Sequence, residues 1–178
     1  IRFFFNKPPV AVVPPDLQSV KNWLLLLIEE SVFFSGGNIP HKKKIIIENN
    51  DSFLIKHSLS PVLVAKGAVD KELLAQFHHH GIVIADREAL RLIDDDKVRV
   101  ESVGTEERFT FWASDIDRED GTVFKINYGG DCIPFWIKKS LSEDEIIDLM
   151  LALRVAISLG LNLVEASQKL KEFDLQKT

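Results

Sequence analysis

The sequence has a single cysteine, no long hydrophobic run and no excess of positive charge. Cys132 alone cannot form an internal disulfide, so nothing indicates a secreted scaffold held by bridges. The longest apolar run, residues 23–28, is far shorter than the roughly 20 residues that span a bilayer. A net charge of -5 offers no electrostatic footprint for nucleic acid. We therefore expect a cytoplasmic domain without a membrane span and without a nucleic-acid partner.

The chain also begins without an initiator methionine, a basic leader or a cleavage signal, since it opens Ile1-Arg2-Phe3. This start predicts a fragment of a longer polypeptide. Its 178 residues suit one domain, and a composition of 46% hydrophobic and 28% charged residues argues against disorder.

Short runs rich in β-branched residues alternate with helical segments in the first part of the chain. They predict strands at residues 10–13, 31–34, 45–47, 62–65 and 82–84. Helices are expected from Asp16, as the cap, to about Glu30, and again at residues 70–77 and 87–93. Continuous apolar strands that alternate with helices are typical of a parallel sheet covered on both faces.

The pattern then changes to alternating strands joined by tight turns. Alternation over residues 109–116 and 122–128, and a strand at 133–137, are separated by Asp120-Gly121 and Gly129-Gly130. These features predict a small antiparallel extension. The expected single domain thus comprises a parallel α/β part (1–102), antiparallel strands (103–139) and a closing helix pair (140–178).

The helix pair has clear start and stop signals. Ser142 and Glu145 form a capping box, Gly160 suits a left-handed C-cap, and Asn162 caps the second helix. The apolar stripe of the first helix contains Ile146, Leu149, Met150, Leu153, Ala156 and Ile157. The buried side of the second contains Leu163, Ala166, Leu170 and Phe173.

Several segments, taken in order, resemble the central, ATP-binding domain of the Mur ligase family, the enzymes that add amino acids to the peptidoglycan precursor. The segments that carry this resemblance are residues 72–74, 81–86, 103–104, 111–116, 120–124 and 156–173. The resemblance implies a mostly parallel sheet flanked by helices, with a topology like that of P-loop NTPases.

The chain departs from this family at the nucleotide loop. There the family has a glycine-rich loop ending Gly-Lys-Thr, whose N–H groups and lysine hold phosphates. The same place here reads Pro-Pro-Asp-Leu-Gln-Ser over residues 14–19, so that Asp16, Gln18 and Ser19 form only a vestigial nucleotide loop. Prolines lack N–H donors, Asp16 repels phosphates, and Gln18 replaces the lysine. We expect no triphosphate to bind.

Other family positions also differ. The Gly-x-His-Asn motif becomes Ser142-Glu143-Asp144-Glu145, the adenine-side asparagine falls on Ile84, and the segment after the fourth strand is shortened to residues 65–67, without a histidine. Glu48 matches the acidic residue that helps the family bind magnesium. It is the candidate metal ligand of this sequence, although a lone acid that ends a strand is common.

Four further groups of residues could in principle bind a ligand or take part in catalysis. Residues 78–80 are three histidines, 42–44 three lysines and 94–96 three aspartates, and each is interpreted as a solvated turn or guard rather than a metal or phosphate site. Cys132 is expected to be a buried packing residue rather than a nucleophile. Trp112, Phe135 and Trp136 are expected in the core or on a sheet face.

These observations predict a non-catalytic Mur-ligase-like domain, without catalytic residues or a cofactor, that acts in binding, scaffolding or regulation linked to peptidoglycan precursor synthesis. Its partner would be another protein or a neighbouring domain. One alternative is an ATP-dependent amide ligase with an atypical nucleotide loop, which would use Mg-ATP. Another is a purely structural domain beside a catalytic one.

Overall fold

The computed structural model describes residues 9–28, 31–33, 44–48, 52–94 and 96–175. Its strands are β1 (Val10–Val12), β2 (Ser31–Phe33), β3 (Lys44–Ile47), β4 (Val62–Ala65), β5 (Ile82–Ala85), β6 (Arg99–Gly104), β7 (Phe111–Asp117), β8 (Thr122–Tyr128) and β9 (Asp131–Ile137). Its helices are α1 (Gln18–Leu27), α2 (Ser52–His57), α3 (Lys71–Ala75), α4 (Arg87–Leu92), α5 (Glu143–Ser158) and α6 (Leu163–Leu175). None of the helices in this described part is long and apolar enough to cross a membrane.

The strands form one sheet in the order β2-β3-β1-β4-β5-β6-β7-β8-β9. Neighbours from β2 to β7 pair in parallel, whereas β7, β8 and β9 pair antiparallel. The five strands predicted from β-branched runs thus lie together in one parallel sheet, and the antiparallel extension is confirmed. Of the predicted second strand, residue 34 lies outside the described part.

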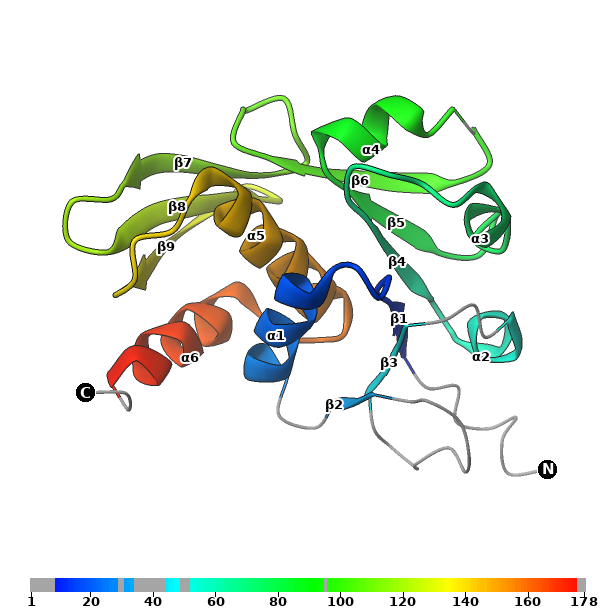
Figure 1. Ribbon diagram of the computed structural model, residues 1–178, viewed down its shortest axis with the longest axis horizontal. Helices are drawn as coiled ribbons and strands as arrows, with labels where there is room; N and C mark the ends of the chain where they lie inside the picture. The colour runs from blue at the N-terminus through cyan, green and yellow to red at the C-terminus, as the bar shows by residue number, and fades with distance from the viewer. Residues whose placement is uncertain (1–8, 29–30, 34–43, 49–51, 95, 176–178) are drawn as a thin grey trace.

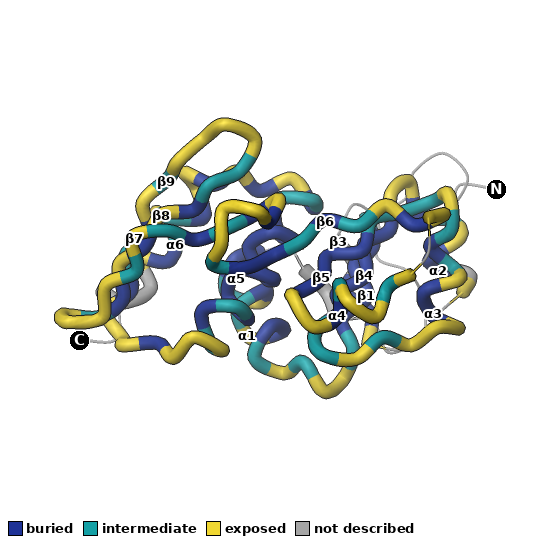
Figure 2. The backbone as a smooth tube through the Cα atoms, turned by 90° about the horizontal axis from the view of Figure 1, so that it is seen from above, coloured by how far each residue is buried: buried dark blue, intermediate teal, exposed yellow. Residues whose placement is uncertain are grey.

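Helices cover both faces of the parallel part (Figure 1). Alternate strand residues supply the two cores: Ala11 packs with α1 and α5, whereas Val10 and Val12 pack with α2 and α3. This alternation is the period-2 geometry of a strand. It explains why the central strands are apolar on both sides. Figure 2 shows that these strands are buried.

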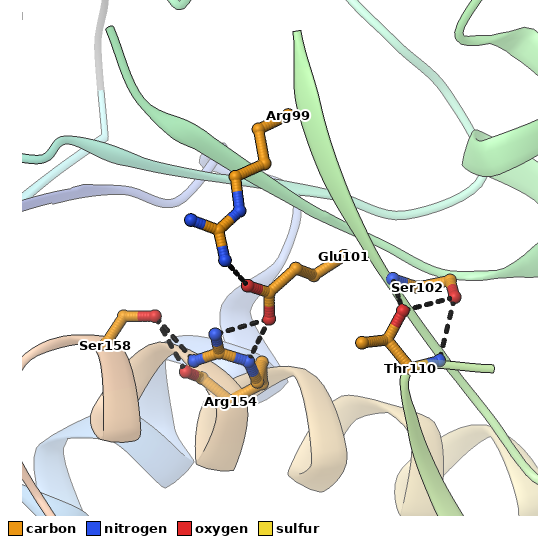
Figure 3. Close-up of polar contacts among 6 residues, drawn as sticks. All are labelled: Arg99, Glu101, Ser102, Thr110, Arg154 and Ser158. Carbon is orange, nitrogen blue, oxygen red and sulfur yellow. Dashed lines mark hydrogen bonds and ion pairs between the residues drawn. The ribbon is translucent and has the colours of Figure 1, made fainter. Parts of the chain in front are cut away.

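β6 is a strand that the sequence pattern does not predict. Polar and charged residues make up half of it, and one of them, Glu101, is buried. β6 pairs with β5 over residues 99–102 and with β7 at Val103 and Gly104, so it crosses the expected boundary between the parallel and antiparallel parts. The connection from β6 to β7 is held by a hydrogen bond, in which the Thr110 N–H donates to the Ser102 hydroxyl at 3.0 Å (Figure 3).

The antiparallel hairpins use the predicted glycine turns. Gly129 and Gly130 have φ of 61° and 92° and join β8 to β9 as a two-residue loop. Positive φ at both central positions is what a type I′ turn requires, and glycine adopts it without a steric penalty.

α5 is more deeply buried than its predicted stripe requires. The predicted stripe is buried except for Ile157, which is partly buried. Leu151, Ala152 and Val155 are buried as well, because α5 lies between the sheet, α1 and α6. The two caps are formed as expected: Ser142 and Glu145 make a complete capping box, and Asn162 accepts the Glu165 N–H at 2.8 Å. On α6, Leu163, Ala166 and Leu170 are buried as predicted, and the Phe173 side chain lies outside the described part.

A buried ion pair joins α5 to β6 (Figure 3). Arg154 Nε donates to Glu101 Oε2 at 2.5 Å, and both residues are 4% exposed. Arg154 also donates to the Ser158 hydroxyl at 2.7 Å and lies over the Tyr128 ring, 4.8 Å from its centroid. The exposed Arg99 guanidinium contacts the other Glu101 oxygen at 3.1 Å. These contacts satisfy a pair of charges that burial would otherwise make costly.

Substituting the most central side chain of α5 should cost substantial stability. Leu153 is fully buried, so Leu153→Ala should lower the free energy of unfolding by about 2–5 kcal/mol, through lost burial and a residual cavity. Leu25→Ala is the control, because Leu25 is half exposed on α1 and should cost at most about 0.5 kcal/mol. Urea denaturation measures both, and equal costs would contradict this packing of α5.

Removing one partner of the buried ion pair should cost more than removing the exposed one. Arg154→Met leaves Glu101 as a buried charge, and we expect a loss of about 3–5 kcal/mol in the free energy of unfolding. Arg99→Met removes an exposed contact and should cost about 1 kcal/mol or less. Adding Glu101→Leu to Arg154→Met should recover much of the loss in the same denaturation experiment. Similar losses for the two arginine variants would show that burial of the pair does not matter.

Candidate functional site

The loop after β1 is a tight turn that places Asp16 in solvent. The Leu17 N–H donates to the Pro14 carbonyl at 3.0 Å, so Pro15 and Asp16 are the central turn residues. Proline at the first central position suits such a turn. The prediction that Asp16 caps α1 is therefore wrong: Leu17 is the N-cap residue, without a side-chain cap, and Asp16 points into solvent.

The three residues of the predicted vestigial loop do not converge on one point. A cavity of about 350 Å³ beside the loop is lined by Asp16 and by Glu48, but not by Gln18 or Ser19. The Gln18 amide instead donates to the Asn22 side chain at 2.9 Å, along the surface of α1. Ser19 lines a separate hollow of about 270 Å³.

Glu48, the candidate metal ligand at the end of β3, has a cationic partner within the chain. Lys21 Nζ lies 2.7 Å from Glu48 Oε1 and donates to the Pro15 carbonyl at 3.3 Å. Lys21 is 3% exposed, whereas Glu48 is exposed. Within the described ranges, no group of three histidine, cysteine or acidic residues could hold a metal ion. Sequence reasoning missed Lys21, whose only signal is its place on the apolar side of α1, one position after Val20.

A partly buried ammonium lies directly after β4. Lys66 Nζ is 2.7 Å from Asp148 Oδ1 and 2.8 Å from Asp144 Oδ1, and both aspartates belong to α5. Burial lowers the pKa of Lys66, but the bonds to the two carboxylates outweigh it and raise that pKa above its ordinary value of 10.5. The acidic segment at residues 142–145 thus contributes Asp144 to the ion pairs of Lys66.

A cavity of about 540 Å³ opens at the carboxyl ends of β4, β5 and β6, and we call it the β4–β6 cavity. It is bounded by Lys66 after β4, Asp86 after β5, Phe109 before β7, and Glu143 and Asp144 at the start of α5. The edge at the carboxyl ends of the strands is where open α/β sheets bind their ligands. Sequence reasoning did not single out this cavity, because its walls come from five separate segments.

Gly104 shapes the floor of the β4–β6 cavity. The Phe109 ring packs so closely on Gly104 that an added Cβ would lie 2.4 Å from ring carbons. Any larger residue at position 104 would therefore displace an aromatic side chain that lines the cavity.

The remaining groups lie apart from these cavities. The three histidines, residues 78–80, follow α3 in a turn. Of the three aspartates, Asp94 and Asp96 are exposed and Asp95 lies outside the described part, as do Lys42 and Lys43 of the lysine group. Cys132 was expected to be buried, and this prediction is wrong because Cys132 is exposed. The alternation of β9 places Phe135 in the core, so Cys132 lies on the opposite face, together with the half-buried Trp136.

The structure is similar to solved Mur ligases. MurF from Acinetobacter baumannii has a TM-score of 0.64 at 10% identity, over 93% of this chain and 45% of its own. MurF from Thermotoga maritima in complex with ADP has a TM-score of 0.62 at 14% identity, over 90% of this chain and 48% of its own. The murein peptide ligase from Psychrobacter arcticus has a TM-score of 0.59 at 13% identity, over 91% and 46%.

These likenesses confirm the predicted fold, that of the Mur ligase central domain. The chain spans about half the length of these ligases. No family model and no curated protein matches the sequence.

The capping box of α5 contains an acid-sensitive side chain, Glu145. The bonds from Lys139, at 2.5 Å, and from the Ser142 backbone lower the pKa of Glu145 from its ordinary value of 4.5 to about 2. A group whose pKa falls on folding stabilises the protein above its unfolded pKa, and this stabilisation is lost as the pH falls through the folded pKa.

Glu145→Gln should therefore lower the free energy of unfolding at pH 7 and have little effect near pH 2. The loss at pH 7 should be about 1 kcal/mol or less, because the pair is exposed to solvent. Urea denaturation between pH 7 and about 2 measures it, with Glu119→Gln as a surface control. A penalty that stays constant over this range would contradict the lowered pKa.

Proposed function

We propose that this chain is a non-catalytic domain with the Mur ligase central fold, which binds a ligand, a protein partner or a neighbouring domain in connection with peptidoglycan precursor synthesis. The observation that carries the proposal is the turn at residues 14–19. A phosphate cradle needs several converging N–H groups and a cation. Here two prolines lack N–H groups, and the Leu17 N–H is already bonded to Pro14.

The nearby cations support the same proposal. Lys21 and Lys66 lie near the loop, and each is paired with carboxylates of this chain. The cavity beside the loop is lined by three acids, Asp16, Glu48 and Asp70, which would repel a triphosphate. A divalent ion held by Glu48 alone would depend on nucleotide phosphates for its other ligands.

Calorimetry with millimolar Mg-ATP should give no saturable heat. MurF from Thermotoga maritima, whose structure holds ADP, serves as the positive control. The double variant Leu17→Gly with Gln18→Lys should not gain ATP turnover, because the acidic segment at residues 142–145 remains in place of the Gly-x-His-Asn motif. Saturable micromolar binding by the unmodified chain would contradict the proposal and favour an ATP-dependent ligase.

A further inference from the structure

The β4–β6 cavity carries more negative than positive charge. Five acidic and two basic side chains line it, and both basic side chains already have partners. Lys66 is paired with Asp144 and Asp148. Arg87 NH1 lies 3.1 Å from Glu106 Oε1. A net negative cavity attracts cations and repels anions.

Asp86 is a buried residue that lines this cavity. It is 8% exposed, and its Oδ1 accepts the Gly67 N–H at 3.1 Å and the Ala89 N–H at 2.8 Å. Within the described residues, Oδ2 accepts no hydrogen bond. Oδ2 is therefore still able to accept a hydrogen bond, and a positively charged N–H donor at this point would gain a charge-assisted one.

Two more carboxylates line the same cavity as Asp86, and neither has an ion-pair partner in the described part of the chain. Glu88 belongs to the first turn of α4, and Glu143 is the first residue of α5. The first turns of these helices also favour anions, but both ends are already occupied: Asp86 caps α4, and Ser142 with Glu145 caps α5. The unpaired carboxylates are therefore the groups left to meet a ligand.

The other walls are apolar. Val103, Phe109 and Ile147 line the same cavity, and Gly104 allows the Phe109 ring to lie close to the strand. An alkyl chain could lie against these side chains while a charged end reaches Asp86. Burial of methylene groups contributes roughly 0.8 kcal/mol each to binding.

We propose that the β4–β6 cavity binds a primary alkylammonium group, with the ammonium at Asp86 and Glu88 and its alkyl stem on Val103, Phe109 and Ile147. This inference rests on the proposed binding function and names the class of ligand. The cationic group could belong to a free diamine or to a lysine-like side chain, and both have the same chemistry at the cavity.

The test is calorimetry of the full chain with 1,5-diaminopentane, and with glutarate as a probe of the same carbon number and opposite charge. The diamine should bind saturably, and its Kd should rise with salt concentration because the contacts are charged. Glutarate should give no saturable heat. Absence of diamine binding, or equal binding of glutarate, would overturn the inference.

Two matched variants locate the site. Asp86→Asn keeps an acceptor for the Gly67 and Ala89 N–H groups and an N-capping side chain, so α4 should be retained. It should weaken diamine binding about tenfold or more, the factor expected when one charge-assisted hydrogen bond is lost. Asp70→Asn is the control, because Asp70 caps α3 in the same manner and does not line this cavity. It should change Kd by less than about twofold, well under the tenfold loss that corresponds to 1.4 kcal/mol.

Glu88→Gln provides a second, exposed variant in case Asp86→Asn unfolds the domain, and it should weaken binding severalfold. Diamine binding unchanged in both Asp86→Asn and Glu88→Gln would contradict this site. Mg-ATP titrated into the same samples separates the two proposals. Saturable Mg-ATP heat would contradict the non-catalytic function alone, whereas loss of the diamine result contradicts only this inference.

Discussion

The arrangement of this domain depends on two ion pairs that hold α5 against the sheet, one of them buried and the other partly buried. Arg154 bonds to Glu101 of β6, and Asp148 bonds to Lys66 after β4. The two α5 residues are six positions apart, which is about 9 Å along a helix axis. Hydrophobic contacts are non-directional and would tolerate sliding of the helix. Two ion pairs at fixed separation allow one register only, so they determine where the first turn of α5 meets the strand ends.

That register also determines the chemistry of the carboxyl edge. The start of α5 brings Asp144 to Lys66 and Glu143 to the rim of the β4–β6 cavity. Lys21 and Glu48 form a further ion pair. It lies at the turn of residues 14–19, where Lys21 also donates to the Pro15 carbonyl. Lys21 and Lys66 thus have internal carboxylates as partners, and among the described residues the net charge lining the cavity is negative.

Local sequence signals predicted much of the fold but little of the site. β-Branched runs, glycine turns and the capping residues Ser142 and Asn162 act over a few positions, and they predicted strands, hairpins and helix ends correctly. Burial of Glu101 or Lys21 depends on partners far along the chain, Arg154 and Glu48, which no local pattern reveals. For the same reason polar β6 was missed, and the face of β9 that Cys132 occupies was misjudged.

The last strand of the sheet has a protected edge. Pro134 lies in the middle of β9 and has no N–H, and its carbonyl accepts the Ser167 hydroxyl of α6 at 2.7 Å. An unprotected edge strand offers donors and acceptors to strands of other molecules, and this is how domain swapping and amyloid growth begin. At its middle, β9 has neither group to offer. Pro134 thus makes it harder for the sheet to grow from this end.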